Sequence, residues 1–292
     1  CRSVPYAVLM EAALQPCGWL AAYMGSALKS EKPLHFRNLG GHGIPHREVS
    51  PDSGTLRVRT RLSHVSEVTD MIIEHFDFEI SNHDGLVYDG STYFGFFTRN
   101  ALERQEGIRE AAKKAFTPAP DQMAHGRAAV FTDEAPLTPA DPGCDPSPAL
   151  ALPARALRMI DRIDLFIPDG GPAGLGFVRG SKDIDPQEWF FKAHFYQDPV
   201  CPGSLGIESF LQLLKFVARE RWPQLAESHR FALATGKSHR WTYRGQILPQ
   251  NRTVTVEAVV SQVTESPHPA LHANGCLMVD GLTIYCMEDF GI

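Results

Sequence analysis

The 292-residue sequence has no excess of basic residues and no long apolar run. Lysine and arginine number 28 against 34 aspartates and glutamates, which gives a formal net charge of −6. A nucleic-acid partner usually requires a basic surface, so this balance argues against one. No run of 18 consecutive apolar residues occurs, so we expect no membrane-spanning helix. These absences favour an ordinary globular protein.

Regular cysteine spacing and the common cofactor motifs are also missing. The six cysteines are Cys1, Cys17, Cys144, Cys201, Cys276 and Cys286, and they contain no C-x-x-C pair. This pattern predicts free thiols in a reducing compartment, and hence a cytoplasmic protein. Neither a glycine-rich nucleotide loop nor a G-x-S-x-G elbow is present, so nicotinamide and serine-hydrolase chemistry have no support. We expect no metal and no organic cofactor.

Two copies of one pattern are present instead. PYAVLMEAALQ covers residues 5–15 and PGSLGIESFLQ covers residues 202–212, with proline, glutamate and glutamine at matching positions. Each motif leads into an apolar stretch that predicts a long helix. A helix that is apolar on every side is normally enclosed by other elements.

Strand-like alternation follows each predicted helix. The predicted strands cover residues 55–65, 71–81, 252–263 and 270–280. Each half then ends in a predicted hairpin, with Asp89-Gly90 and Asp280-Gly281 as the turns, because Asp-Gly between apolar runs is a strong hairpin signal. We therefore predict an α+β fold of two antiparallel sheets, each wrapped around a long central helix.

A proline-rich segment separates the two copies. Residues 117–153 contain eight of the 22 prolines and no sustained apolar period, which is typical of a loop. We predict a first unit over residues 1–117, a linker over 118–153 and a second unit over 154–292. Only the second unit has about forty residues before its helix. The first unit is therefore expected to be incomplete at its N-terminus, without a counterpart of His194.

Several motifs of the second half resemble one enzyme family. They are MIDRID (159–164), DIDPQEWFFKAHF (183–195), DPVCPGSLGIESFLQ (198–212), GQILPQNRTVTVEAVV (245–260) and VDGLTIY (279–285). They are similar to the hot-dog-fold β-hydroxydecanoyl thioester dehydratases of fatty-acid synthesis. The two-copy arrangement resembles the dehydratase region of polyunsaturated fatty acid synthases. The predicted fold is thus a double hot dog.

The resemblance implies an activity and its partners. Such an enzyme removes water from 3-hydroxyacyl thioesters and leaves trans-2-enoyl thioesters. The acyl group is carried on the phosphopantetheine arm of an acyl carrier protein, and other domains of a multidomain synthase are further partners. Carrier proteins are acidic, so we expect basic residues near the second unit's tunnel to form a patch. The candidates are Lys192, Lys215, Arg219, Arg221, Lys237, Arg240 and Arg244.

In that family a histidine and an acidic residue 14 positions later carry the chemistry, and His194 and Glu208 have this spacing. Histidine titrates near neutrality and suits the base that takes the α-proton. Burial disfavours charge, so a carboxyl on a buried helix can stay neutral and act as the acid. Backbone N–H groups of Gly203 and Ser204, at the start of the predicted helix, suit the developing negative charge. Gly203, Ser204 and Gln212 are the predicted substrate-binding residues. Gln212, one turn after Glu208, either hydrogen-bonds the Glu208 carboxyl, which we favour, or faces a neighbouring element.

Which glutamate serves His194 depends on how the units pair. In the family the active site lies between two hot dogs, with the histidine of one facing the acid of the other. If the two halves pack in this way, the acid is Glu11, which occupies the same helix position as Glu208. Pairing with a second copy, in a homodimer, is the alternative.

Two other functions are compatible with the pattern. One is a non-catalytic, structural double hot dog that docks carrier domains within a synthase. The other is a hot-dog thioesterase, with water as the nucleophile. The intact histidine motif favours the dehydratase, because a site without chemistry has little need of a histidine, a turn and a carboxylate together.

Overall fold

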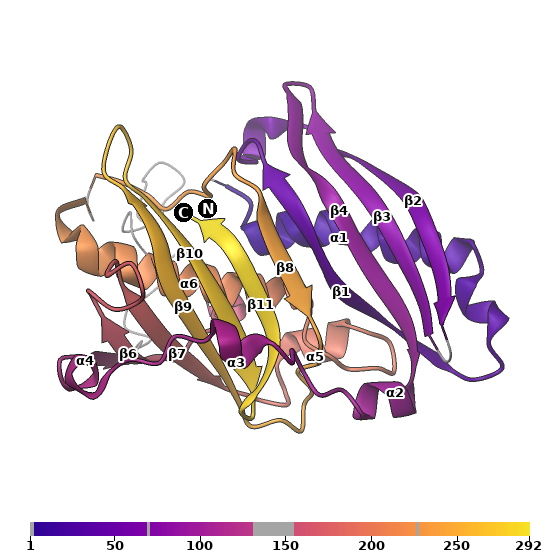
Figure 1. Cartoon of the computed structure of the whole chain (residues 1–292). Helices are drawn as coiled ribbons and strands as arrows, with labels where there is room; N and C mark the ends of the chain where they lie inside the picture. Colours follow the sequence, from indigo (N-terminus) through magenta and orange to yellow (C-terminus); the bar gives the residue numbers. More distant parts are fainter. Residues whose placement is uncertain (1–2, 69–70, 131–154, 226–227) are drawn as a thin grey trace.

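The computed structural model describes residues 3–68, 71–130, 155–225 and 228–292. Eleven strands form one antiparallel sheet in the order β2-β3-β4-β1-β8-β11-β10-β9-β7-β6-β5. Two long helices, α1 (Tyr6–Tyr23) and α6 (Gly203–Arg221), lie on the same face of this sheet (Figure 1). No helix in these ranges is long and apolar enough to cross a membrane. The α+β class is confirmed, whereas the two predicted sheets are one.

The first unit packs α1 against four strands. Their bounds are β1 (Leu34–Pro45), β2 (Arg57–Val68), β3 (Met71–Asn82) and β4 (Gly85–Thr98). The helix starts directly after Pro5, whose fixed φ suits a helix start. In β3 alternate side chains, from Ile72 to Ile80, are buried toward the helix, as the period of two predicts.

The second unit repeats this arrangement and extends it. Its elements are β6 (Arg162–Ile167), β7 (Phe177–Asp183), α5 (Trp189–Ala193), α6, β8 (His239–Tyr243), β9 (Thr253–Thr264), β10 (Ala270–Val279) and β11 (Leu282–Gly291). The order β1-β4-β3-β2 recurs as β8-β11-β10-β9, so the predicted repeat is confirmed. The units join where β1 pairs with β8, and Gly41 leaves room there for the Trp241 ring.

The connection between the units is not a simple linker. It contains α2 (Arg99–Glu103), α3 (Ala111–Lys114), α4 (Pro120–Ala124) and β5 (Arg127–Val130). Short 3₁₀ turns elsewhere cover Ser26–Lys29, Pro51–Ser53, Arg155–Leu157 and Pro223–Leu225. In Figure 1, α3 crosses the sheet face opposite the long helices. Because β5 pairs with β6, this part of the predicted linker belongs to the second unit's sheet, and residues 131–154 lie outside the described residues.

One of the two predicted hairpin turns is wrong. Asp280-Gly281 does connect β10 to β11, with positive φ at both residues. Asp89-Gly90, however, lies inside β4, and the turn that precedes β4 is at residues 83–84. Gly90 serves close strand packing instead, because a Cβ there would stand 2.1 Å from the His42 carbonyl oxygen.

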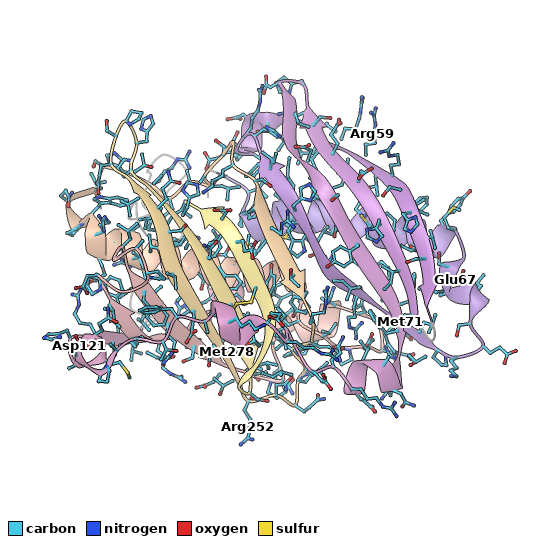
Figure 2. The ribbon with its side chains drawn as sticks, viewed as in Figure 1. Arg59, Glu67, Met71, Asp121, Arg252 and Met278 are labelled. Carbon is cyan, nitrogen blue, oxygen red and sulfur yellow. A yellow bond between two sulfur atoms is a disulfide. The ribbon has the colours of Figure 1, made fainter. Side chains whose placement is uncertain are left out.

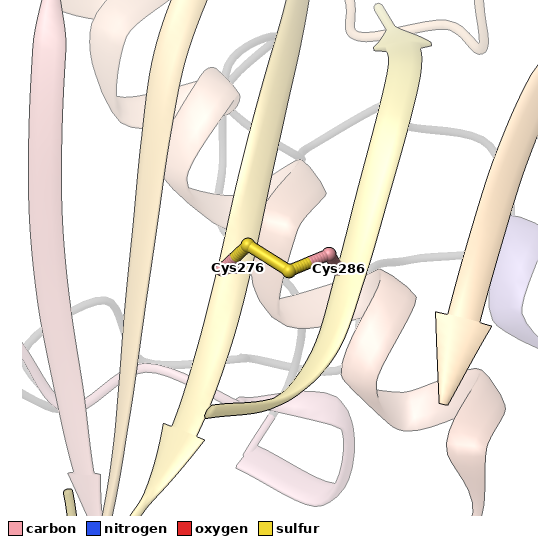
Figure 3. Close-up of a disulfide and its surroundings, with 2 residues drawn as sticks. All are labelled: Cys276 and Cys286. Atoms are coloured by element: carbon pink, nitrogen blue, oxygen red, sulfur yellow. A yellow bond between two sulfur atoms is a disulfide. The ribbon is translucent and has the colours of Figure 1, made fainter. Parts of the chain in front are cut away.

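The prediction of free thiols is wrong for two cysteines. Cys276 on β10 and Cys286 on β11 face each other across the strand pair and form a disulfide (Figure 3). The sequence does not reveal this pairing because it depends on strand register. Cys17 and Cys201 are free and buried. Because disulfides are rare in reducing compartments, the cysteines give less support to a cytoplasmic protein, and this localisation stays a prediction.

Enclosure also differs between the two helices. The outward residues of α6 are mostly covered, as predicted for a helix that is apolar on most sides. Along α1, in contrast, Val8, Trp19 and Tyr23 are exposed. The prediction that both helices are enclosed is therefore wrong for α1.

The position of Gly90 can be tested by substitution. We expect Gly90→Ala to lower the free energy of unfolding by about 3 kcal/mol or more, because the added methyl group meets a backbone carbonyl. Gly281→Ala, at a true turn with nothing near its Cβ, should cost only about 1 kcal/mol, from positive φ. Urea unfolding of both variants measures the difference. Equal costs would contradict the placement of Gly90 within a strand.

Candidate active site

His194 ends α5 and lies in the loop that leads to α6. Its Nδ1 is 2.9 Å from the Val200 carbonyl oxygen, and its own carbonyl accepts a hydrogen bond from the Val200 N–H at 2.9 Å. Since a carbonyl can only accept, Nδ1 carries the hydrogen. In the neutral ring Nε2 then keeps its lone pair. The side chain is half-buried and has the tautomer that a base requires.

A cross-unit contact holds this loop. Arg37 on β1 donates two hydrogen bonds to Asp198, at 2.8 and 2.9 Å, and His35 contacts the same carboxylate at 2.9 Å. Gln246 accepts two further hydrogen bonds from Arg37. Burial opposes ionisation of Asp198, but the hydrogen bonds from Arg37 and His35 outweigh it and lower its pKa to about 2. The loop that carries His194 is thus tied to the first unit.

Gly203 and Ser204 lie beside the same loop. They are the first two residues of α6, so the helix supplies no carbonyl for their N–H groups. The atom nearest to a Cβ built on Gly203 is a ring carbon of Tyr243, at 3.9 Å. The backbone at this helix N-terminus is therefore open to close approach. The adjacent Cys201 is anchored by a hydrogen bond from its N–H to the Ile247 carbonyl.

Glu208 is 2% exposed and has polar partners. One carboxylate oxygen accepts a hydrogen bond from Gln212, at 3.0 Å, and lies 3.3 Å from the Lys215 ammonium group. The predicted hydrogen bond between Gln212 and the carboxyl is confirmed. The Gln212 amide also bonds the backbone of Leu157 and Met159. Gln212 therefore links α6 to the segment before β6, and the Glu208 carboxylate is on the side of α6 that faces this segment.

Glu11 on α1 acts electrostatically on a residue beside the histidine loop. Burial raises the pKa of the Cys201 thiol, and the negative charges of Glu188 and Glu11 raise it further. The Glu11 carboxylate is therefore within electrostatic range of Cys201. Cys201 directly follows Val200, which holds the His194 ring. His194 and Gly203 are close along the chain, Glu11 acts electrostatically on Cys201 between them, and Glu208 contacts Gln212 and Lys215.

An apolar cavity adjoins Cys201. Its walls come from α5, the first half of α6 and strands of the second unit. The lining residues are Met159, Lys182, Ile184, Glu188, Phe190, Phe191, Cys201, Leu205, Gly206, Ser209, Ile247, Val254 and Leu277. Lys182 and Glu188 pair at 3.0 Å, so the charges in the lining compensate each other. The remaining surface suits a hydrocarbon chain.

In the first unit, the helix position that corresponds to Gly203 carries a large side chain. Tyr6 occupies the helix position that Gly203 has in α6, and its hydroxyl donates to Tyr88 at 2.9 Å. The Tyr6 hydroxyl also contacts Nε2 of His239. Burial, with a smaller contribution from His42, lowers the pKa of His239 to about 3. This buried cluster leaves the N-terminus of α1 without the open backbone that α6 has.

Sequence reasoning missed the residues that hold the loop. Asp198 was visible as part of an Asp-Pro turn, but its partner Arg37 is 161 residues away. Only the pairing of β1 with β8 brings the two together. No local pattern marks His35. Gln246 stands in the GQILPQNRTVTVEAVV motif, but nothing in that motif indicates a contact with Arg37.

Four of the seven basic residues that were expected to form a patch already have polar partners. Lys215, Arg221 and Lys237 are in ion pairs, and Arg244 donates to backbone carbonyls and Tyr93. The exposed members outside these ion pairs are Lys192, Arg219 and Arg240. A basic patch built from these three stays a prediction.

Comparisons with known proteins agree with this architecture. Residues 152–288 match the family model described as FabA-like domain. A polyunsaturated fatty acid synthase component from Thraustochytrium sp. is 32% identical over 311 residues, which include 99% of this chain and 20% of the relative. The chain thus spans about a fifth of that relative's length.

Two solved structures share the fold. One is a Lactobacillus plantarum protein assigned as an oleoyl thioesterase, with a TM-score of 0.53 at 9% identity over 99% of this chain and 89% of the other. The second is the 12:0-ACP thioesterase of Umbellularia californica, with a TM-score of 0.50 at 11% identity over 100% of this chain and 88% of the other. Identities this low support a shared fold and not a shared activity.

The depressed pKa of Asp198 predicts a pH-dependent stability. The ionised carboxylate stabilises the fold above the ordinary aspartate pKa of about 4, and this contribution is lost as the pH falls toward 2. We expect Asp198→Asn to lower the free energy of unfolding by roughly 2 kcal/mol at pH 7 and to match the wild type near pH 2. Urea titrations across this range measure the effect, with exposed Asp169→Asn as an unaffected control. A difference that stays constant down to pH 2 would contradict it.

Proposed function

We propose, from the match of residues 152–288 to the FabA-like family model, that the chain is a dehydratase acting on 3-hydroxyacyl thioesters. The product is the trans-2-enoyl thioester and water. The observation that carries the proposal is the His194 ring, whose Nδ1–H is held by the Val200 carbonyl so that Nε2 is free to accept a proton. The same groups, used in reverse, hydrate the enoyl thioester.

The first proton transfer uses His194. Nε2 takes the proton from the α-carbon, and the electrons of the C–H bond move toward the thioester carbonyl. Negative charge then develops on the thioester oxygen. Gly203 and Ser204, at the N-terminus of α6, offer N–H groups and the positive end of the helix dipole to this oxygen. The open backbone at Gly203 supports this binding mode.

The second proton transfer is assigned to Glu11. As the bond from the β-carbon to its hydroxyl breaks, the Glu11 carboxyl group gives a proton to the oxygen, which leaves as water. The returning electrons form the double bond between the α- and β-carbons. Two observations support Glu11 over Glu208. Glu11 acts electrostatically on Cys201 beside the histidine loop, whereas Glu208 is engaged by Gln212 and Lys215.

One active site per chain is proposed, built from both units. The filled N-terminus of α1, with Tyr6 in the position of Gly203, supports a single site. The acyl chain would occupy the apolar cavity beside Cys201. An acyl carrier protein would present it, and exposed Lys192, in α5 just before His194, is available to an acidic carrier. The chemistry uses only side chains and backbone of this chain.

The activity can be tested by hydration. Incubation with a soluble trans-2-enoyl thioester should give the 3-hydroxyacyl thioester, followed as loss of enoyl absorbance. We expect His194→Ala to reduce the rate at least about 100-fold, because the base is removed. Exposed His268→Ala should have no effect. An unchanged rate in His194→Ala would overturn the proposal, and release of free thiol without hydrated product would indicate a thioesterase.

The choice of acid can be tested with two matched variants. Glu11→Gln should reduce the hydration rate at least about 100-fold while the fold stays stable, because Glu11 is half-buried and gives up only its proton. Glu208→Gln should keep most activity but lower the free energy of unfolding by roughly 1–2 kcal/mol, because Lys215 loses its partner. Both rates are measured as above, and stability by urea unfolding. Loss of activity only in the Glu208 variant would refute the cross-unit arrangement.

A further inference from the structure

The Cys276–Cys286 disulfide lies on the face of the sheet that is turned away from α6. The next residue along each strand faces the helix instead: a Cβ built on Gly206 of α6 would stand 3.8 Å from Leu277 and 2.6 Å from the Tyr285 ring. Successive side chains of a strand alternate between the two faces, so the adjacent cysteines point outward. Figure 3 shows α6 behind the strand pair that the disulfide joins.

The ladder between β10 and β11 is irregular on both sides of this disulfide. The register shifts between Ala273 and Gly275 on one side, and between Leu277 and Met278 on the other. Asp289, opposite the first shift, has a positive φ, and Met278, at the second, is labelled in Figure 2. A bulge leaves a residue unpaired and disrupts the ladder locally. The disulfide therefore joins the two strands where their hydrogen bonding holds them least.

The same disulfide adds little to the topology of the chain. Its cysteines are separated by only 10 positions, and the Asp280-Gly281 turn already connects the two strands. A cross-link that closes a short loop constrains the unfolded chain less than one that closes a long loop. We therefore expect the hairpin to form without the bond. Cys276 is also partly exposed, which lets a small thiol approach.

The helix-facing neighbours of the two cysteines belong to the apolar cavity or support it. Leu277 and Gly206 both line the cavity, and the Tyr285 ring packs against Gly206. Phe210, one turn after Gly206, meets the Tyr285 ring with centroids 5.4 Å apart. A Cβ built on Gly275 would stand 2.9 Å from the Phe210 ring. The wall of the cavity therefore rests on the strand pair that the disulfide joins, and a shift of β10 against β11 changes this wall.

We infer that Cys276 and Cys286 form a thiol–disulfide exchange site whose state sets how firmly the cavity holds a long acyl chain. The exchange partner is a dithiol. Its thiolate attacks one cysteine sulfur and forms a mixed disulfide, and its second thiolate then displaces that cysteine. Two electrons and two protons pass to the protein, which gains two thiols, while the dithiol becomes a cyclic disulfide. The identity of the cavity's occupant rests on the proposed function.

The exchange and its local effect are tested first. The 292-residue chain is equilibrated with reduced dithiothreitol, and mass spectrometry after alkylation with iodoacetamide locates the new thiols. We expect these at Cys276 and Cys286, with hydrogen exchange about tenfold faster in β10 and β11 and unchanged in β3 and β4. Equal exchange in the oxidised and reduced forms would overturn the inference. Loss of protection throughout the chain would also overturn it, because the bond would then be required for the fold.

The effect on the cavity is tested with a long and a short substrate. Hydration of decenoyl and crotonyl pantetheine is compared for the oxidised and reduced protein, after the dithiothreitol has been removed. We expect reduction to raise KM for the decenoyl substrate about fivefold, roughly the effect of losing contact with one buried methylene group. KM for the crotonyl substrate should not change, because a short chain makes few cavity contacts. kcat should not change either, because Arg37 of the first unit holds the His194 loop through Asp198.

A double variant and a ligand that cannot be hydrated complete the test. Cys276→Ser combined with Cys286→Ser should give the values of the reduced protein, with or without dithiothreitol. Binding of decanoyl pantetheine, measured by calorimetry, should weaken about fivefold on reduction, whether or not the chain is a dehydratase. Weaker binding without any hydration would refute the proposed function and support this inference. Equal binding to both forms, with hydration intact, would overturn the inference alone.

Discussion

The partly buried ion pair between Arg37 and Asp198 joins the two units at the loop that carries His194. Arg37 comes from β1 of the first unit, and its guanidinium donates both hydrogen bonds to a carboxylate of the second. A buried guanidinium needs such a partner, because an unpaired charge away from water is costly. The position of the candidate base therefore depends on how the units pack, and the β1–β8 junction is part of the site.

The two units share one strand order and one long helix, but different elements cover the two helices. At the start of α6 the backbone of Gly203 is open, whereas Tyr6 fills the equivalent place on α1 and is bonded to Tyr88. In a similar way α6 is covered by the strands that precede it, and α1 is not. The repeat supplies two equivalent helices. The elements that cover the two helices therefore differ between the units.

Much of the fold followed from local patterns. Proline starts both long helices, alternation marks the strands, and Asp280-Gly281 forms the expected turn. Asp89-Gly90 misled because glycine serves two purposes, positive φ in turns and close approach between strands, and the sequence does not distinguish them. The Cys276–Cys286 disulfide and the merging of two sheets into one were missed because both depend on strand register.

The sequence by itself determined the candidate catalytic segment, with His194, the Pro-Gly helix start and the glutamate, because these residues are neighbours along the chain. Only the tertiary structure decided the surroundings of each. Glu208 contacts Gln212 and Lys215, Glu11 acts electrostatically on Cys201 from the other unit, and Arg37 binds Asp198 in the histidine loop from 161 residues away. Contacts between residues so far apart in the sequence depend on how strands pair and how helices pack, and no local pattern encodes them.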